Sequence, residues 1–593
     1  MKYKKTLYIL FTATVLVSGC TKDYEKMPKE YVSDQYAFDV TDPNGTQAEL
    51  FLAGIYAQMP LGYNRIGSGI SGNRLALNDE GGTPLDASAD DGVSTIQNTA
   101  GERVSLSGYT PFYNPDDCWG NSYGGIRLAN IFLANYNKIP WAQANKRQYY
   151  GAEARFLRAF FYFELVKRYG GVILVGDQVF SLNDNLDLPR SSYDQCVTYL
   201  VSELDAIKDL LRPDQFGAGG GGNSDIGRIS KGAAYALKAK ILLYSASPQN
   251  NANNDPARWE AAANAAKAVM TLGTFQLESD VRNVFTTLNN REMIFYKIHG
   301  LTSGTTATVQ TNALEYALSP VGYTVANTIS RGRVSPSQEL VDAFPTSRGL
   351  PISTDLKSAS NTNGFDANNP YANRDPRLTL TVFFNGQTWQ NRAVETFVNG
   401  RDNMSSDAVK TRTGYYQRKF LGNFASGSTY GNSYRPWSYI RYAEILLDFA
   451  EARNEFSGPD TEINNALVLL RARAGIPATT AGTATSVAVL NYGIPTVSAG
   501  VTKDQMRIFI RNERRIELAF EEQRYWDLRR WKIAEAVYNS GVSGMSIVKN
   551  SNGTLTYTKV PVVTPFFQAR MYLYPIPYNQ VASGKNLSQN PGW

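Results

Sequence analysis

The chain has 593 residues, several times the usual size of one hydrophobic core, which predicts two or more packed units. Its 43% hydrophobic and 19% charged residues are typical of a globular protein, and a formal net charge of +6 is too balanced for a nucleic-acid binder. A single histidine, His299, and three cysteines exclude histidine-rich zinc sites, cysteine-cluster metal sites and a disulfide scaffold, so no metal or cofactor is expected.

The first twenty residues predict export and lipid attachment. A basic start precedes the mainly apolar run 6–19, which is too short to span a bilayer and has the form of a secretory signal. The run ends Leu-Val-Ser-Gly-Cys, which resembles a bacterial lipobox, in which Cys20 becomes the lipid-modified first residue; an ordinary signal peptide is the alternative. No later stretch reaches 18 consecutive apolar residues, so we expect anchoring rather than spanning. Cys118 and Cys196 are expected to be two isolated thiols, although an oxidising compartment permits a disulfide.

The polar stretch Gly62–Ser122 carries five acidic side chains close together. They are Asp79, Glu80, Asp86, Asp90 and Asp91. Their spacing does not fit the twelve-residue calcium loop. We therefore expect a solvated acidic loop rather than a cation site.

Amphipathic periodicity predicts most of the regular structure. In 152–167, Phe156, Phe160 and Phe163 recur at three- and four-residue steps between charged side chains, which is typical of a helix. A short extended run, 172–175, follows. Similar patterns predict further helices over 192–211, 231–245, 257–272, 441–454, 463–474, 503–520 and 524–537. The helices come in pairs with short joins, which favours stacked hairpins of the tetratricopeptide type, although no strict 34-residue repeat is present.

Long polar stretches lie between the predicted helices. In addition to Gly62–Ser122, these polar stretches are 213–229, 299–335, 351–373 and 479–502. The glycine-rich run 217–222 is a flexible connection and not a phosphate loop, because it does not lie between a strand and a helix. Long loops on a rigid helical scaffold commonly carry binding sites.

Segment 511–532 concentrates charge, with seven basic and five acidic side chains. Glu513, Glu517 and Glu521 are spaced by four and therefore share one face of a helix. This pattern has two interpretations, a ligand-binding charge cluster or a lattice of ion pairs that ties helices together. We favour the lattice because the charges nearly cancel and neighbouring rings supply packing. Arg441 and the polar turn 373–377 are interpreted in the same way.

Several motifs follow one another in a fixed order. They are AEARFLRAFFYFELVKRYGGV at 152–172, PSQEL at 336–340, NRDPRL at 373–378, YIRYAEILLDFAEARN at 439–454, RNERRIELAFEEQRYWDLRRW at 511–531, LYPIP at 573–577 and QNPGW at 589–593. With the lipobox, these motifs resemble the SusD/RagB family of outer-membrane lipoproteins from Bacteroidetes-type bacteria. The resemblance runs from Cys20 to Trp593.

The resemblance implies a mainly all-α fold with tetratricopeptide-like helical hairpins, long loops and few short strands. It divides the chain into a signal peptide (1–19), an N-terminal region (20–280) and a C-terminal region (281–593). It implies a surface-exposed lipoprotein of the outer membrane that binds oligo- or polysaccharide, and a SusC-like TonB-dependent β-barrel transporter as its partner.

The same resemblance leaves alternative functions open. Its RagB-like branch suggests oligopeptides as the ligand. A glycan hydrolase would need two carboxyl groups placed across a cleft, which sequence alone does not identify. A purely structural surface protein is the remaining alternative. Because the resemblance points to binding without chemistry, we expect a binding protein and not an enzyme.

Sugars present flat apolar C–H faces and a rim of hydroxyl groups. Their sites therefore need exposed rings beside amide and carboxylate side chains on a rigid scaffold. Residues of these types occur in Gly62–Ser122, in 299–335 and near residue 389, and Phe112 is among the rings of the first stretch. The candidate ligand contacts are Tyr63, Asn78, Asp79, Tyr109, Tyr113, Tyr316, Tyr323 and Trp389. For each of them, anchoring of its own loop is the alternative role.

Overall fold

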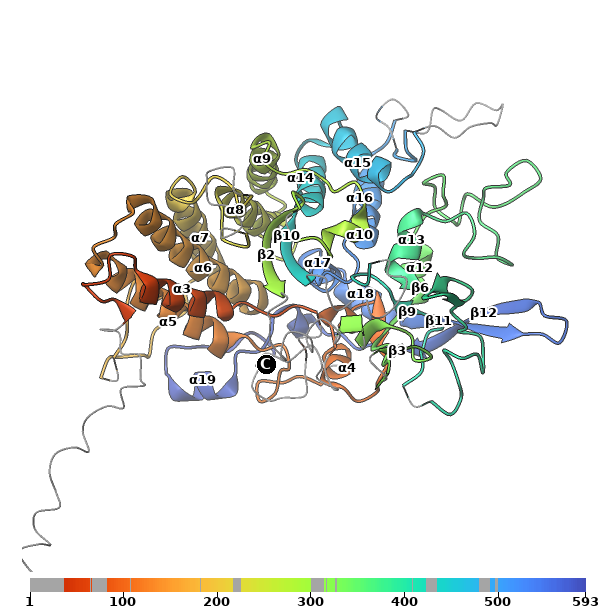
Figure 1. The fold of residues 1–593 in the computed structure, drawn as a ribbon, viewed down its shortest axis with the longest axis horizontal. Helices are drawn as coiled ribbons and strands as arrows, with labels where there is room; N and C mark the ends of the chain where they lie inside the picture. The colour runs from red at the N-terminus through yellow and green to blue at the C-terminus, as the bar shows by residue number, and fades with distance from the viewer. Residues whose placement is uncertain are drawn as a thin grey trace, which may run out of the picture.

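The computed structural model describes residues 37–63, 66, 83–106, 108–181, 183–216, 226–288, 290–299, 314–315, 317–325, 328–407, 409–422, 435–478, 491–495, 497 and 500–593. Within these ranges the chain is mainly helical, and its strands form only two-stranded antiparallel pairs. The predicted fold class is therefore confirmed (Figure 1).

The scaffold is an array of long helices that pack side by side in chain order. The helices of the N-terminal part are α3 (Thr46–Ala57), α5 (Trp119–Asn135), α6 (Ala144–Tyr169), α7 (Tyr193–Ile207), α8 (Lys231–Ala246) and α9 (Pro256–Thr271). Each helix from α5 to α9 packs against the next, and α9 packs against α14 (Tyr442–Ser457) (Figure 1). Helix α14 in turn contacts α15 (Thr461–Arg473) and α16 (Lys503–Glu517), so the array continues into the C-terminal part.

Shorter helices complete the fold. They are η2 (Leu85–Ser88), α4 (Ala100–Ser105), η3 (Tyr136–Lys138), α10 (Val281–Val284), α12 (Gln338–Ala343), α13 (Pro376–Thr381), α17 (Gln523–Arg530), α18 (Ala534–Asn539), η7 (Ala569–Tyr572) and α19 (Tyr578–Ser583). The predicted helix 524–537 is wrong as one element, because Lys532 adopts a positive φ of 59° and separates α17 from α18. The predicted polar stretch Gly62–Ser122 contains η2, α4 and the start of α5, so it is not a loop throughout.

The strands pair locally or tie distant segments together. The longer pairs are β2 (Met293–His299) with β10 (Arg435–Arg441) and β11 (Val542–Lys549) with β12 (Leu555–Val563). The short pairs are β1 (Gly92–Ser94) with β5 (Val334–Pro336), β3 (Thr324–Val325) with β4 (Thr328–Ile329), β6 (Val382–Phe383) with β9 (Tyr416–Gln417), and β7 (Thr388–Trp389) with β8 (Arg392–Ala393). The extended run 172–175 joins no strand.

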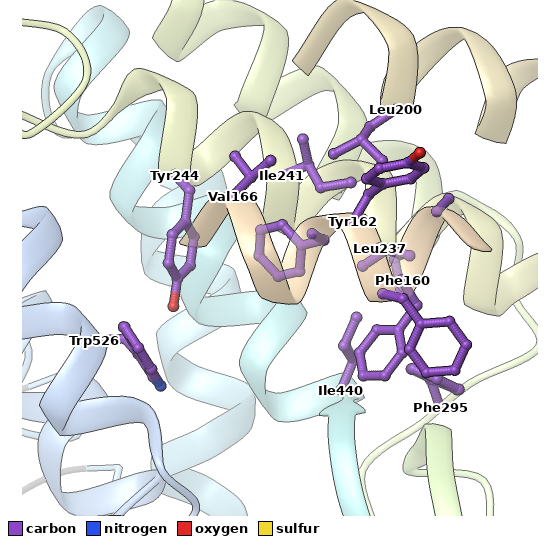
Figure 2. Packing of buried hydrophobic residues seen from close by; sticks show 14 of the residues in the cluster. Phe160, Tyr162, Val166, Leu200, Leu237, Ile241, Tyr244, Phe295, Ile440 and Trp526 are labelled. Carbon is purple, nitrogen blue, oxygen red and sulfur yellow. The ribbon is translucent and has the colours of Figure 1, made fainter. Parts of the chain in front are cut away.

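The largest hydrophobic core is shared by the two regions of the sequence. Phe295 of β2 contacts Phe160 of α6 with ring centroids 5.0 Å apart (Figure 2). Its ring lies at the same distance from that of Phe156, also in α6. Ile440 and Trp526 belong to the same cluster. The division of the chain at residue 280 remains a prediction, and the residues on either side of it pack into this one core.

The charges of segment 511–532 form a buried lattice of ion pairs, as predicted. Arg441 contacts carboxylate oxygens of Glu292 at 2.5 Å, Glu517 at 2.8 Å and Glu521 at 2.7 Å. Arg377 contacts Glu517 as well, at 3.0 Å. Each of these five side chains is 4% exposed or less. The lattice joins the residue before β2 to β10, α13 and the end of α16, so its role is to hold these elements together.

The acidic residues of the first polar stretch belong to a similar arrangement. Asp86, Asp90 and Asp91 are buried, so the expectation of a solvated acidic loop is wrong for them. Arg515 lies 2.7 Å from Asp91, and Arg524 donates two hydrogen bonds of 2.8 Å to Asp90. These arginines lie 424 and 434 residues away in the sequence, which is why local composition did not reveal the pairing. Asp79 and Glu80 lie outside the described residues.

A capping box fixes the start of α7, and its loss has a measurable cost. The Ser192 hydroxyl accepts a hydrogen bond from the Gln195 backbone, and the Gln195 side chain accepts one from the Ser192 backbone. Ser192→Ala is expected to lower the free energy of unfolding by about 1 kcal/mol. Urea denaturation followed by circular dichroism measures this loss. Ser202→Ala on the exposed face of the same helix is the matched control, and equal effects of the two variants would contradict the prediction.

Candidate functional site

Four of the eight candidate ligand residues are buried. Their exposed fractions are 2% for Tyr63, 1% for Tyr109, 5% for Tyr323 and 2% for Trp389. The expectation of exposed rings is wrong at these positions. Of the other candidates, Tyr113 is half-buried, and Asn78, Asp79 and Tyr316 lie outside the described residues.

The buried candidates anchor loops. The Tyr63 hydroxyl donates to the Pro436 carbonyl at 3.1 Å, and its ring packs against Phe420 and Trp437. The Tyr323 hydroxyl donates to the Trp389 carbonyl at 3.2 Å. Burial raises the pKa of the Tyr323 phenol, so this group remains a neutral donor at physiological pH. These contacts are those of the loop-anchoring alternative.

Tyr113 is held by its own neighbourhood. The Arg103 guanidinium carbon lies 5.9 Å from the centre of the Tyr113 ring. Backbone hydrogen bonds join Thr110 and Tyr113 in both directions, at 2.7 and 3.1 Å. The intervening residues therefore form a tight turn on the surface.

Described residues from three parts of the chain, near residues 63, 299 and 435, lie close together. Residue 299, the last of β2, pairs with residue 435, the first of β10. Tyr63 packs on Trp437 of the same β10 strand. Ile66 and Thr83 exchange backbone hydrogen bonds of 3.0 and 2.9 Å, so the two ends of stretch 67–82 also meet. No position for Asn78, Asp79 or Tyr316 follows from these pairs, because all three lie outside the described residues.

Two exposed aromatic rings form a pair on the surface, which we call the aromatic platform. Phe112 is 74% exposed and Tyr578 is 53% exposed. Their ring centroids lie 4.5 Å apart with an interplanar angle of 31°. The Tyr578 amide donates to the Pro111 carbonyl at 2.8 Å, and the Phe112 amide donates to the Thr110 hydroxyl at 3.2 Å. These hydrogen bonds therefore hold the backbone at both rings.

Sequence reasoning placed Phe112 in a candidate stretch but did not select it, and it missed Tyr578. Each ring directly follows a proline, Pro111 or Pro577, in a polar surface segment. That signal is not specific, because Trp437 also directly follows a proline and is buried. Nothing local indicates that two segments from opposite ends of the sequence meet, because their contact depends on the assembled fold.

Cavities also lie among the helices, apart from this platform. A groove of about 460 Å³ runs between α7, α8 and α9, with mainly apolar walls that include Leu204, Leu242 and Ala265. A small cavity of about 40 Å³ lies between α6, α8, β10 and α17, where Tyr244 and Trp526, both labelled in Figure 2, are among the lining rings.

Lys167 lines the smaller of these cavities. Its ammonium group lies 2.6 Å from Glu164 and 4.8 Å from the Trp526 ring centre. Burial lowers the pKa of Lys167 to about 8, although Glu164 opposes this shift. The cavity therefore has paired charges and little net charge.

The remaining chemistry of the described residues is limited. Cys118 and Cys196 are free thiols, as predicted. Among the residues that the structure describes, no His, Cys, Asp and Glu side chains gather in a group that could hold a metal ion. No helix in the described part of the chain has the length and apolar character to cross a membrane.

Comparisons with known proteins cover the whole chain. A model of the SusD family matches residues 291–593, and a model described as starch-binding associating with outer membrane matches residues 85–243. SusD-like protein P2 of Formosa agariphila is 25% identical over 619 aligned residues, which cover 100% of both chains. The similarity therefore extends well beyond isolated motifs.

Solved structures have the same fold. A SusD-like protein from Bacteroides fragilis aligns with a TM-score of 0.72 at 25% identity, over 96% of this chain and 100% of its own. A laminarin binding SusD-like protein aligns with a TM-score of 0.60 at 20% identity, over 93% of this chain and 100% of its own. At that identity the second likeness bears on the fold alone.

Proposed function

The chain belongs to the SusD family, and from this premise we propose that it is a cell-surface lipoprotein that captures oligo- or polysaccharide. The observation that carries the proposal is the similarity to SusD-like protein P2 along the entire chain, together with the SusD family match. The proposal includes delivery of the glycan to a SusC-like TonB-dependent transporter, with this protein as its lid. The description of the family model that matches residues 85–243, starch-binding associating with outer membrane, supports a glycan as the ligand.

Binding without catalysis is the second part of the proposal. A hydrolase needs two carboxyl groups free to act on a glycosidic bond. The buried carboxylates of Glu292, Glu513 and Glu517 are instead held by arginines at distances of 2.5 to 3.1 Å. These carboxylates are already paired with arginines of the scaffold, which supports a binding role.

The location proposed is the outer membrane, with the lipid on Cys20 as the anchor. The lipobox-like run before Cys20 supports this location. The family description of the matching region 85–243 refers to association with the outer membrane, which agrees with it. A lipid on the first residue leaves the folded part free on the membrane surface.

Affinity electrophoresis and calorimetry of the mature chain, purified in detergent, test the function. We expect saturable binding to at least one member of a panel of plant, fungal and host glycans, with no product released. We also expect a β-barrel protein to copurify from the native membrane. A heat-unfolded sample controls for nonspecific retention in the gel.

Each alternative function has its own outcome in this experiment. Saturable binding of oligopeptides with no glycan binding would replace the glycan by a peptide. Release of shorter sugars would establish a hydrolase. A folded protein that binds neither ligand class and copurifies with no barrel would contradict the proposal as a whole.

A further inference from the structure

We infer that the aromatic platform, Phe112 with Tyr578, is a glycan contact that stacks against the apolar faces of sugar rings. This inference rests on the proposed function and assigns part of the glycan-binding site to this place on the surface. The platform is formed by the turn around Pro111 and by the first residue of α19, which lies on the lower edge of the molecule in Figure 1.

The exposure of the pair is the first reason. Aromatic rings usually supply buried contact area, and the four buried candidates above follow that rule. Phe112 keeps 74% of its surface in water although it touches another ring. Exposed apolar surface of this kind marks interaction sites.

The chemistry of the pair is the second reason. A pyranose ring presents C–H groups on its faces and hydroxyl groups at its rim. An aromatic face has negative π density that attracts such C–H groups, and the Tyr578 phenol adds a hydroxyl group that can donate or accept. Asn579, the next residue of α19, is also exposed and offers an amide. The platform therefore combines an apolar surface with polar groups beside it.

The rigidity of the pair is the third reason. The Tyr578 amide is bonded to the Pro111 carbonyl, and Thr110 and Tyr113 close the turn around Phe112. Prolines at positions 111 and 577 restrict the backbone directly before each ring. A ring on a backbone fixed before binding loses less conformational entropy when a ligand stacks on it than a ring on a flexible loop.

Four variants of the full mature chain test the inference by calorimetry with the glycan found for the unaltered protein. Phe112→Ala and Tyr578→Ala are each expected to weaken binding about tenfold, which is typical of a stacked ring truncated at a binding site. Phe112→Leu keeps apolar area but removes the π face and is expected to lose as much affinity as Phe112→Ala. Phe112→Tyr keeps the ring and is expected to bind within about twofold of the unaltered protein.

Ile508→Ala is the matched control, because Ile508 is 70% exposed on α16 and carries no ring. Its affinity and the thermal midpoints of all variants should remain unchanged. Unaltered glycan affinity in the Phe112→Ala and Tyr578→Ala variants would overturn the inference, and reduced copurification of the barrel in the same variants would assign the pair to protein docking. Failure of the unaltered chain to bind any glycan would instead contradict the proposed function, and the platform with it.

Discussion

Arg441→Ala is expected to lower the free energy of unfolding by about 3–5 kcal/mol, because it removes a buried guanidinium that three carboxylates share. The side chain of Arg441 is 1% exposed and reaches Glu292, Glu517 and Glu521. Lys419 still contacts Glu521 at 2.6 Å, and Arg473 still contacts Glu292 and Glu517, so the expected loss comes from the guanidinium that bridged all three carboxylates. The variant should therefore unfold at clearly lower urea concentration.

The midpoints of urea and thermal unfolding, followed by tryptophan fluorescence and circular dichroism, measure this effect. Midpoints are the appropriate quantities because a chain of this size need not unfold in one step. Arg401→Ala is the matched control, since Arg401 is 72% exposed and lies 3.8 Å from Glu395. An exposed pair of this kind contributes at most about 1 kcal/mol. Equal shifts in the two variants would contradict the role assigned to the lattice.

A conservative variant separates charge from geometry at the same position. Arg441→Lys restores a positive charge but cannot reach three carboxylates with one planar fork of donors. We expect a midpoint between those of the unaltered protein and Arg441→Ala. A lysine variant as stable as the unaltered protein would mean that charge alone, and not the bridging of β2, β10 and α16, accounts for the stability.

The long helices were predictable because their periodicity is local. The predicted helix 231–245 is observed as Lys231–Ala246, and 257–272 as Pro256–Thr271. Helix α5 was not predicted, and it contains three glycines, which lower helix propensity. One of them, Gly125, is needed for packing, because a Cβ there would lie 2.5 Å from the Phe161 ring. At this helix the low helix propensity of glycine argues against a helix, whereas the close packing of the helix against Phe161 requires a glycine.

The candidate site was much less predictable, because side-chain exposure depends on contacts between distant segments. Tyr63 is buried only because Trp437 of β10 covers it, and Tyr323 because it packs under the β7–β8 turn. Conversely, Phe112 is exposed although it lies in the same polar stretch as buried Tyr109. The buried and the exposed rings are of similar type and lie in similarly polar stretches. The sequence therefore indicated which kinds of residue to consider, but not which of them are exposed to water.

The protein is expected to lose stability steeply as the pH falls from about 5 to 2. Burial alone would raise the pKa of Glu517, but Arg473, Arg441 and Arg377 hold it well below its usual range. Burial likewise opposes the shifts of Glu451 and Glu164, yet Arg530 lowers the pKa of Glu451 to about 2, and Lys167 and Arg168 lower that of Glu164 to about 2.

The sign of this dependence follows from proton binding. An unfolded glutamate binds its proton near pH 4.3, whereas these folded carboxylates bind theirs only near pH 2 or below. Their stabilisation is therefore complete above about pH 5 and is lost as the pH falls through the folded-state values. A shift of two units corresponds to about 2.7 kcal/mol for one group. Several such groups acting together predict acid unfolding before pH 2.

Asp448 should change the pH dependence of stability in the opposite direction, and it therefore serves as an internal control. Burial raises the pKa of Asp448 to about 7, against the attraction of Arg514. Its contribution to stability is therefore greatest below about pH 4 and is lost as the pH rises towards 7. Urea midpoints measured from pH 2 to 8 should fall steeply below pH 5, and Asp448→Asn should flatten the profile between pH 5 and 7 while leaving the acid limb in place. A midpoint that stays constant down to pH 2 would mean that the arginines do not hold these glutamates ionised, since an ionised buried carboxylate must release its stabilisation when it binds a proton.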